Sequence, residues 1–174
     1  MTEAAYDFQS LRVLVVDDSR SMRHIIRSIM NALGCREIRE AGDAPAAFKE
    51  MQNFAAGIIV VDWYMEPLDG LEFVRLVRTA KDSRNPFVPI IMLSGFTEYR
   101  RVAEARDAGV NEYLAKPVSV TVLGNRIVSL IDHPREFIRT KSFFGPCRRR
   151  TDLGPPRGKK ERRKEFLAAI NATS

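Results

Sequence analysis

The feature that most constrains the fold is a regular alternation of short, mostly apolar runs with longer amphipathic segments. The runs are rich in Val and Ile, which is typical of strands buried on both faces. They predict strands over residues 11–16, 37–41, 57–62, 88–93 and 111–115. Apolar residues at helical spacing predict helices over residues 20–33, 43–54, 71–80, 97–108 and from Pro117 to about 131. Gly34 is the expected stop of the first helix, and Asp43 is the expected cap at the start of the second. Five strand-helix pairs with short connections indicate an α/β fold with a doubly wound, five-stranded parallel sheet.

The composition is that of a globular protein with a basic appendage. Hydrophobic residues make up 45% of the 174 residues and charged residues 29%, which is close to globular averages and excludes a disordered chain. Residues 1–133 carry 16 Lys and Arg against 18 Asp and Glu, whereas residues 134–174 carry 12 against 4. We therefore expect a lead over residues 1–10, a single domain over 11–133 and a basic, irregular and flexible tail over 134–174.

The sequence shows no sign of export. Cys35 and Cys147 have no paired spacing, and the first ten residues lack the pattern of a secretory signal. The apolar runs fall far short of the ~20 residues that a membrane-spanning helix needs. We expect a cytoplasmic protein without a membrane span.

Polar side chains stand where four of the predicted strands end. Asp17 and Asp18 follow the first strand, Asp62 ends the third, Ser94 follows the fourth and Lys116 follows the fifth. In open parallel sheets the ligand site lies beyond the carboxyl ends of the strands, so we expect these side chains to converge. Three acids packed together raise one another's pKa unless a cation compensates. Mg²⁺ suits such a site, because it binds one or two carboxylates, a phosphate and several waters.

Asp62 is the candidate nucleophile of this group. A carboxylate can form a covalent aspartyl-phosphate, and phosphoryl transfer depends mainly on positioning and on neutralising charge. Mg²⁺, the Lys116 ammonium and the Ser94 hydroxyl would supply that neutralisation. The phosphoryl group would then be carried on Asp62.

Four segments, VVDDS, VVDWYMEPLDGLEFV, MLSGF and YLAKP, resemble the CheY-like receiver domains of two-component systems. The resemblance covers about residues 9–133 and implies a flavodoxin-like (βα)5 fold. It implies a phosphoacceptor for signalling rather than an enzyme, with Mg²⁺-dependent self-phosphorylation and self-dephosphorylation as its only chemistry. It implies that Mg²⁺ is bound by Asp18, Asp62 and the backbone carbonyl of Tyr64, with Asp17 acting mainly through water.

The resemblance also implies a conformational switch formed by Ser94 and Tyr113. The hydroxyl moves toward the phosphoryl group and the aromatic ring turns inward, so that the face of the fourth helix, fifth strand and fifth helix changes shape for a target protein. Tyr113 has a simpler reading as a core aromatic on the last strand. Tyr64 and Phe96 occupy positions where the family places residues that orient the hydrolytic water, and here they either shield the phosphoryl group or are plain exposed rings.

The tail is too short and too rich in Pro, Gly and Arg for a helix-turn-helix domain, so sequence-specific DNA binding is not expected. Arg148, Arg149 and Arg150 stand close to Phe143 and Phe144. Arginines beside aromatic rings suit a nucleotide or another polyanion, and the tail is broadly similar to the arginine-rich tails with which some CheY-like proteins bind cyclic di-GMP. A passive, solvated arm is the alternative.

Two functions follow from these observations. The leading hypothesis is a stand-alone response regulator that accepts a phosphoryl group on Asp62 from a histidine kinase or phosphotransfer protein and signals by protein contact. The alternative is a ligand-responsive adaptor, in which the tail binds cyclic di-GMP or another polyanion and the receiver serves as a docking platform.

Overall fold

The computed structural model describes residues 6–96 and 98–148, which form a five-stranded parallel sheet and a separate two-stranded hairpin. The strand order of the sheet is β2-β1-β3-β4-β5. The strands are β1 (Arg12–Val16), β2 (Glu37–Ala41), β3 (Ile58–Asp62), β4 (Ile90–Ser94) and β5 (Glu112–Ala115). The helices are α1 (Arg20–Ala32), α2 (Ala44–Asn53), α3 (Gly70–Thr79), α4 (Tyr99–Ala108) and α5 (Val120–Asp132). The predicted flavodoxin-like, doubly wound sheet is confirmed.

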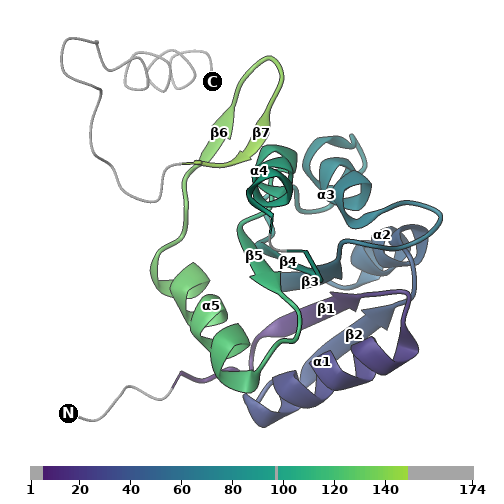
Figure 1. The fold of residues 1–174 in the computed structure, drawn as a ribbon, viewed down its shortest axis with the longest axis vertical. Coiled ribbons are helices and arrows are strands. Elements are labelled where there is room, and N and C mark those ends of the chain that lie inside the picture. Colours follow the sequence, from purple (N-terminus) through teal and green to yellow (C-terminus); the bar gives the residue numbers. More distant parts are fainter. Residues whose placement is uncertain (1–5, 97, 149–174) are drawn as a thin grey trace.

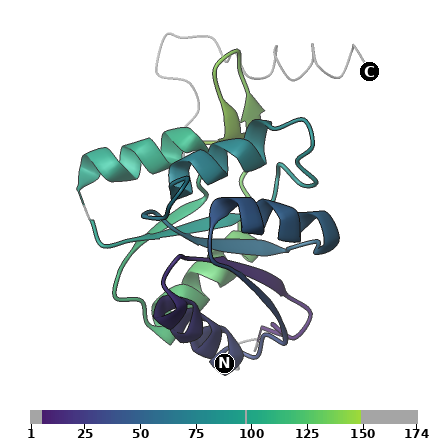
Figure 2. The ribbon, with the colours of Figure 1, turned by 90° about the vertical axis from the view of Figure 1, so that its right-hand side faces the viewer.

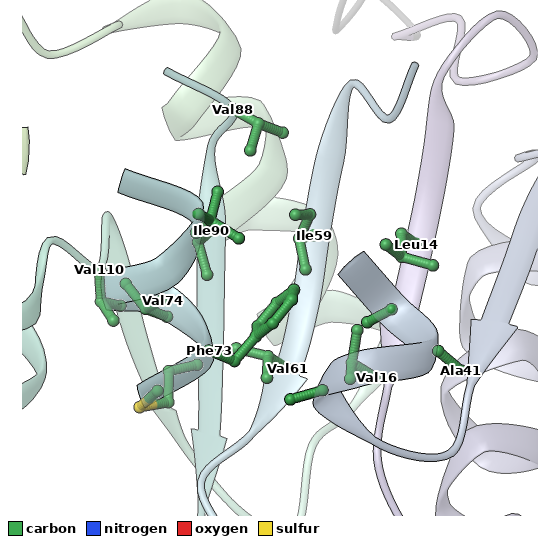
Figure 3. Packing of buried hydrophobic residues seen from close by; sticks show 14 of the residues in the cluster. Leu14, Val16, Ala41, Ile59, Val61, Phe73, Val74, Val88, Ile90 and Val110 are labelled. Atoms are coloured by element: carbon green, nitrogen blue, oxygen red, sulfur yellow. The ribbon is translucent and has the colours of Figure 1, made fainter. Parts of the chain in front are cut away.

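The helices cover both faces of the sheet. α1 and α5 lie on one face, and α2, α3 and α4 lie on the other (Figures 1 and 2). β1 contributes side chains to the hydrophobic cores on both faces of the sheet, because successive side chains of a strand point to opposite faces. Val13 and Val15 belong to the core under α1 and α5, whereas Leu14 and Val16 belong to the core under the other helices. Figure 3 shows this second core around Phe73 of α3.

Short polar side chains determine where the helices begin. The Ser19 hydroxyl accepts from the Met22 backbone N–H at the start of α1, and the Asp43 carboxylate accepts from the Ala46 N–H at the start of α2, as predicted for Asp43. Gly34 and Gly109 follow α1 and α4 with φ of 99° and 103°, a conformation that glycine adopts without strain. Ser19 and Asp43 thus begin the helices directly after β1 and β2, and Gly34 and Gly109 end the helices shortly before β2 and β5. No helix in the described part of the chain is long and apolar enough to cross a membrane.

The prediction of an irregular tail was wrong for residues 137–146. This segment forms an antiparallel hairpin of β6 (Phe137–Arg139) and β7 (Phe144–Pro146). Two strands of three residues give almost no period in a sequence, and the hairpin is stabilised by contacts with distant residues such as Phe87. The remainder of the predicted tail, residues 149–174, and residues 1–5 of the predicted lead lie outside the described residues.

Candidate functional site

The predicted site residues meet at the carboxyl ends of the parallel strands. Asp62 and Ser94 end the neighbouring strands β3 and β4, and the Lys116 backbone N–H donates to the Ser94 carbonyl over 2.7 Å. Nζ of Lys116 lies 2.7 Å from Oδ1 of Asp62 and 3.2 Å from Oδ2 of Asp17. One ammonium group therefore bridges two carboxylates that come from different strands.

Three carboxylates form an acidic cluster beside this ammonium. One oxygen atom from each of Asp17, Asp18 and Asp62 can be chosen so that the three lie within 4.8 Å of one another. Asp17 and Asp62 are 1% and 7% exposed, whereas Asp18 is open to solvent. The Asp17 carboxylate also accepts from the Ser19 backbone N–H over 2.8 Å, which holds it in place. Such a set of oxygen donors with one side open to water fits a hydrated Mg²⁺ ion.

The environment shifts the pKa values of both partners of the central ion pair. Burial raises the pKa of Asp62, Lys116 opposes this effect, and the charge of Asp17 adds to it, so that the pKa lies above 3.8. Burial lowers the pKa of Lys116, but its bonds to Asp62 and Asp17 outweigh burial and leave the pKa raised. The acids outnumber the one ammonium, and this excess of negative charge favours a cation.

A glycine that the sequence analysis did not single out fixes the loop after β3. Gly70 is the first residue of α3, and its N–H donates to the Trp63 carbonyl over 2.8 Å. A Cβ atom at Gly70 would lie 2.1 Å from the backbone oxygen of Asp62. The helix therefore starts in direct contact with the backbone of Asp62. Gly70 lies in the segment VVDWYMEPLDGLEFV, which resembles the receiver family. The spacing of apolar residues by itself gives no signal for the role of Gly70.

The two residues predicted to form the switch are both engaged with Phe96. The Ser94 hydroxyl accepts from the Phe96 backbone N–H over 3.1 Å, and the Tyr113 hydroxyl donates to the Phe96 carbonyl. The Tyr113 ring meets the Trp63 ring edge to face, with 6.1 Å between centroids. Tyr113 is half-buried and packs against the core under α2, α3 and α4.

Exposed aromatic rings border the acidic cluster. The rings of Tyr64 and Phe96 are 5.5 Å apart and are 51% and 43% exposed. Arg101 of α4, which the sequence analysis missed, places its guanidinium 5.3 Å from the Trp63 ring and 5.9 Å from the Phe96 ring. Such cation-π contacts join the start of α4 to the loops after β3 and β4. No pattern in the sequence identifies Arg101, because the contact depends on tertiary packing.

The tail residues predicted to bind a ligand are only partly described. The Phe144 ring packs against Phe87 and Phe137, and Arg148 lies over the Phe143 ring at 4.4 Å. The rings of Phe143 and Phe144 are thus already used within the fold. Arg149 and Arg150 lie outside the described residues.

Known proteins are similar to this chain over most of the described residues. Residues 13–128 match the family model of the response regulator receiver domain. Chemotaxis protein CheY1 of Helicobacter pylori is 36% identical over 118 residues, which cover 67% of this chain and 94% of that protein. Chemotaxis protein CheY of Pseudomonas aeruginosa is 31% identical over 122 residues, with 70% and 97% covered. The solved structure of the chemotaxis response regulator CheY4 of Vibrio cholerae has a TM-score of 0.63 and 30% identity, and the match covers 69% of this chain and 98% of that one.

The family match spans most of the described chain and includes the parallel sheet except for Arg12, the first residue of β1. It also contains the acidic cluster, Ser94 and Lys116. On these grounds the chain belongs to the response regulator receiver domain family and is a CheY-like receiver of two-component signalling.

Proposed function

We propose that the protein is a stand-alone response regulator that accepts a phosphoryl group on Asp62 from a histidine kinase or a phosphotransfer protein. The observation that carries this proposal is the position of Lys116, whose Nζ lies 2.7 Å from Asp62 and 3.2 Å from Asp17 at the carboxyl edge of the sheet. A phosphoryl oxygen placed beside Asp62 would meet this ammonium directly.

The transfer needs little chemistry from the chain. An oxygen of the Asp62 carboxylate forms the bond to phosphorus while the bond from phosphorus to the donor imidazole nitrogen breaks, and the imidazole leaves with the electron pair. Lys116 neutralises one phosphoryl oxygen, and the Ser94 hydroxyl, on the neighbouring strand end, donates to another. Burial of Asp62 keeps bulk water away from the reacting carboxylate.

The acidic cluster is the proposed metal site. Asp18, Asp62 and the backbone carbonyl of Tyr64 hold Mg²⁺, and Asp17 acts through water. Bound Mg²⁺ supplies charge neutralisation for the phosphoryl oxygens. The support is the proximity of the three carboxylates and the exposure of Asp18 to solvent.

The proposed output is a change of the surface formed by α4, β5 and α5. Ser94 and Tyr113 leave their common partner Phe96, the hydroxyl of Ser94 turns to the phosphoryl group, and the ring of Tyr113 turns inward. A protein target then binds the altered surface, where Tyr99, Val102 and Val122 expose apolar area.

We place this signalling in the cytoplasm, in keeping with the free thiols Cys35 and Cys147.

The test of the acceptor is phosphorylation with acetyl phosphate and Mg²⁺, followed by electrophoresis that separates the phosphorylated form. The wild-type protein should take up one hydroxylamine-sensitive phosphoryl group, and Asp62→Asn should take up none. Asp82→Asn, an exposed aspartate outside the cluster, is the matched control and should label like wild type. Full labelling of Asp62→Asn would show that another residue is the acceptor.

The test of the metal site uses the fluorescence of Trp63, which adjoins Asp62. Mg²⁺ should change the emission with modest affinity, because the site offers charge but few rigid ligands. Asp18→Ala should weaken the titration strongly, and Asp82→Ala should not. An unchanged titration in Asp18→Ala would remove Asp18 from the proposed site.

The charge of residues 134–174 keeps polyanion binding as a second candidate function. Affinity for cyclic di-GMP or RNA should fall steeply with salt, and replacing Arg148, Arg149 and Arg150 by Ala should weaken it without changing the labelling of Asp62. Equal affinity in the triple variant would leave the tail as a passive arm.

A further inference from the structure

Residues 134–148, which we name the clasp, lie against the receiver at the end of the sheet opposite to Asp62. The clasp contains β6 and β7 and sits beside α4 (Figure 1). Its Phe137 and Phe144 rings lie 5.1 and 5.3 Å from the ring of Phe87, which precedes β4. Three aromatic rings in mutual contact form a small aromatic cluster, and such pairs attract each other beyond the effect of their buried area.

The clasp and the receiver also approach at backbone distance. Gly145 of β7 is buried, and a Cβ atom on it would lie 2.9 Å from Cα of Gly109. Gly109 is the residue with positive φ that ends α4. The lack of a side chain on both glycines therefore lets the hairpin seat directly on the C-terminal end of α4.

Charged groups join the clasp to the strand and the helix that form the proposed output surface. Arg135 lies 3.2 Å from Glu112, the first residue of β5, and Glu112 is 6% exposed. Arg148 lies 3.4 Å from Asp107 near the end of α4. The pair at Asp107 is exposed and contributes little by itself. The pair at Glu112 is largely buried, with side chains 15% and 6% exposed, and Glu112 also pairs with Arg126 of α5 over 3.4 Å, so that removal of Arg135 would leave a buried charge with one partner fewer.

The clasp and the switch residue Tyr113 line the same cavity. A cavity of about 230 Å³ lies between α4, β5 and the clasp, and its lining includes Tyr113 together with Arg135 and Arg148. In this arrangement the Tyr113 hydroxyl donates to the Phe96 carbonyl, and Ser94 is bonded to the same residue. The clasp is therefore docked while both switch residues are held by the loop after β4.

We propose that the clasp is an intramolecular restraint that stabilises the unphosphorylated arrangement of α4 and β5. The proposal rests on the proposed function of Asp62. Phosphorylation pulls Ser94 and Tyr113 away from Phe96, which requires the start of α4 to move, while the clasp holds the other end of α4 and the start of β5. Because the coupling between two sites is reciprocal, an open clasp favours phosphorylation, and phosphorylation favours an open clasp.

The test is to wedge the clasp open in the full-length chain with Gly145→Val. The added side chain collides with the backbone of Gly109 and leaves every residue of the acidic cluster and the switch unchanged. Lys141→Val is the matched control, because it adds the same side chain to the exposed turn of the same hairpin. Hydrogen exchange at the Cys147 amide, which donates to the Glu136 carbonyl, reports opening. The acetyl phosphate concentration that gives half-maximal labelling reports the switch.

We expect faster exchange at Cys147 in Gly145→Val and a half-maximal concentration about fivefold lower than in wild type, the low end of couplings between sites. Lys141→Val should match wild type in both readouts. Phosphorylation of the wild-type protein should itself speed exchange at Cys147. If the hairpin tolerates valine, the double substitution Phe137→Ala and Phe144→Ala opens it by removing the aromatic core, and the same two readouts apply.

An open clasp with an unchanged or higher half-maximal concentration overturns the restraint and leaves the proposed function intact. Absence of any label in the wild-type protein overturns the proposed function, and the restraint with it. The two failures are therefore distinguishable in one experiment.

Discussion

At the scale of single residues, the burial of Asp62 is costly for the folded protein. The pKa of Asp62 is raised by burial and by Asp17, although Lys116 opposes the shift. The folded state therefore binds the Asp62 proton more tightly than the unfolded state does. For a carboxyl group of this kind the unfavourable contribution is fully present above the folded pKa, and it fades as the pH falls through that value toward 3.8.

Asp62→Asn should accordingly increase the free energy of unfolding at neutral pH, by about 1 kcal/mol. The gain should shrink as the pH is lowered toward 4, because protonation removes the charge in the wild-type protein as well. Urea unfolding of wild type, Asp62→Asn and Asp82→Asn at several pH values, with a chelator present, measures the difference. A gain that is constant with pH would mean that charge burial is not its cause.

The aromatic border of the cluster leads to a second prediction at this scale. Tyr64 and Phe96 are bulky and exposed, their ring centroids are 5.5 Å apart, and neither carries the amide or carboxylate group that would orient a water molecule well toward the phosphoryl group. Replacing Tyr64 by Asn and Phe96 by Glu should hasten loss of the phosphoryl group, as followed by release of inorganic phosphate. Tyr99→Asn is the control, since Tyr99 is 83% exposed on α4. Unchanged or slower decay in the double variant would refute the shielding role.

At the scale of the elements, the contact between α3 and β3 depends on one missing side chain. A Cβ atom on Gly70 would lie 2.1 Å from the Asp62 carbonyl oxygen, so Gly70→Ala must displace either the helix or the acceptor loop. We expect a loss of at least ~2 kcal/mol in the free energy of unfolding and weaker labelling at Asp62. Gly95→Ala in the loop after β4, where a Cβ meets nothing within 4 Å, should change stability by less than ~0.5 kcal/mol. Equal effects of the two substitutions would contradict this account.

The parallel strands were predictable because burial on both faces leaves a strong sequence signal. β1, β3 and β4 are almost wholly buried, and each reads as a continuous apolar run. The helix caps were predictable for the same local reason, since Asp43 and Gly34 act on neighbouring backbone groups. The clasp was not predictable from the sequence, because its few apolar residues gain a partner only when α4 and the segment before β4 are already in place.

The site shows the same division between local and tertiary information. Strand ends identified Asp62, Ser94 and Lys116, because topology alone brings these positions to one edge of the sheet. Arg101 and Gly70 escaped detection, since a cation-π contact and a backbone clearance have no sequence period.

At the scale of the whole molecule, Arg78 connects α3 to the segments before β4 and β5 and to the clasp. Its buried guanidinium donates to the carbonyls of Gly109, Pro86 and Val88 and to the side chain of Asn111, and it lies 5.0 Å from the Phe137 ring of the clasp. Burial lowers the pKa of Arg78 to about 9, which leaves it charged at neutral pH. A single side chain thus ties α3, the segments before β4 and β5, and the clasp together.

Arg78→Met should therefore lower the free energy of unfolding by about 3 kcal/mol, because several buried acceptors lose their donor at once. Arg75→Met, an exposed arginine one turn earlier in α3, is the matched control and should stay within ~0.5 kcal/mol of wild type. Urea unfolding followed by circular dichroism measures both. A loss in Arg78→Met no larger than that in Arg75→Met would show that the acceptors find other partners.

The opposite placement of the acidic cluster and the clasp has a consequence for the order of events in signalling. Asp62 lies at the carboxyl ends of the strands, and the clasp lies at the amino ends of β4 and β5. A phosphoryl donor that docks over Asp62 and a molecule that engages the clasp approach from different ends of the sheet, so neither has to depart before the other arrives. If a partner engages the clasp, phosphoryl transfer to Asp62 does not have to wait for that partner to leave, and donor and partner bind in random order.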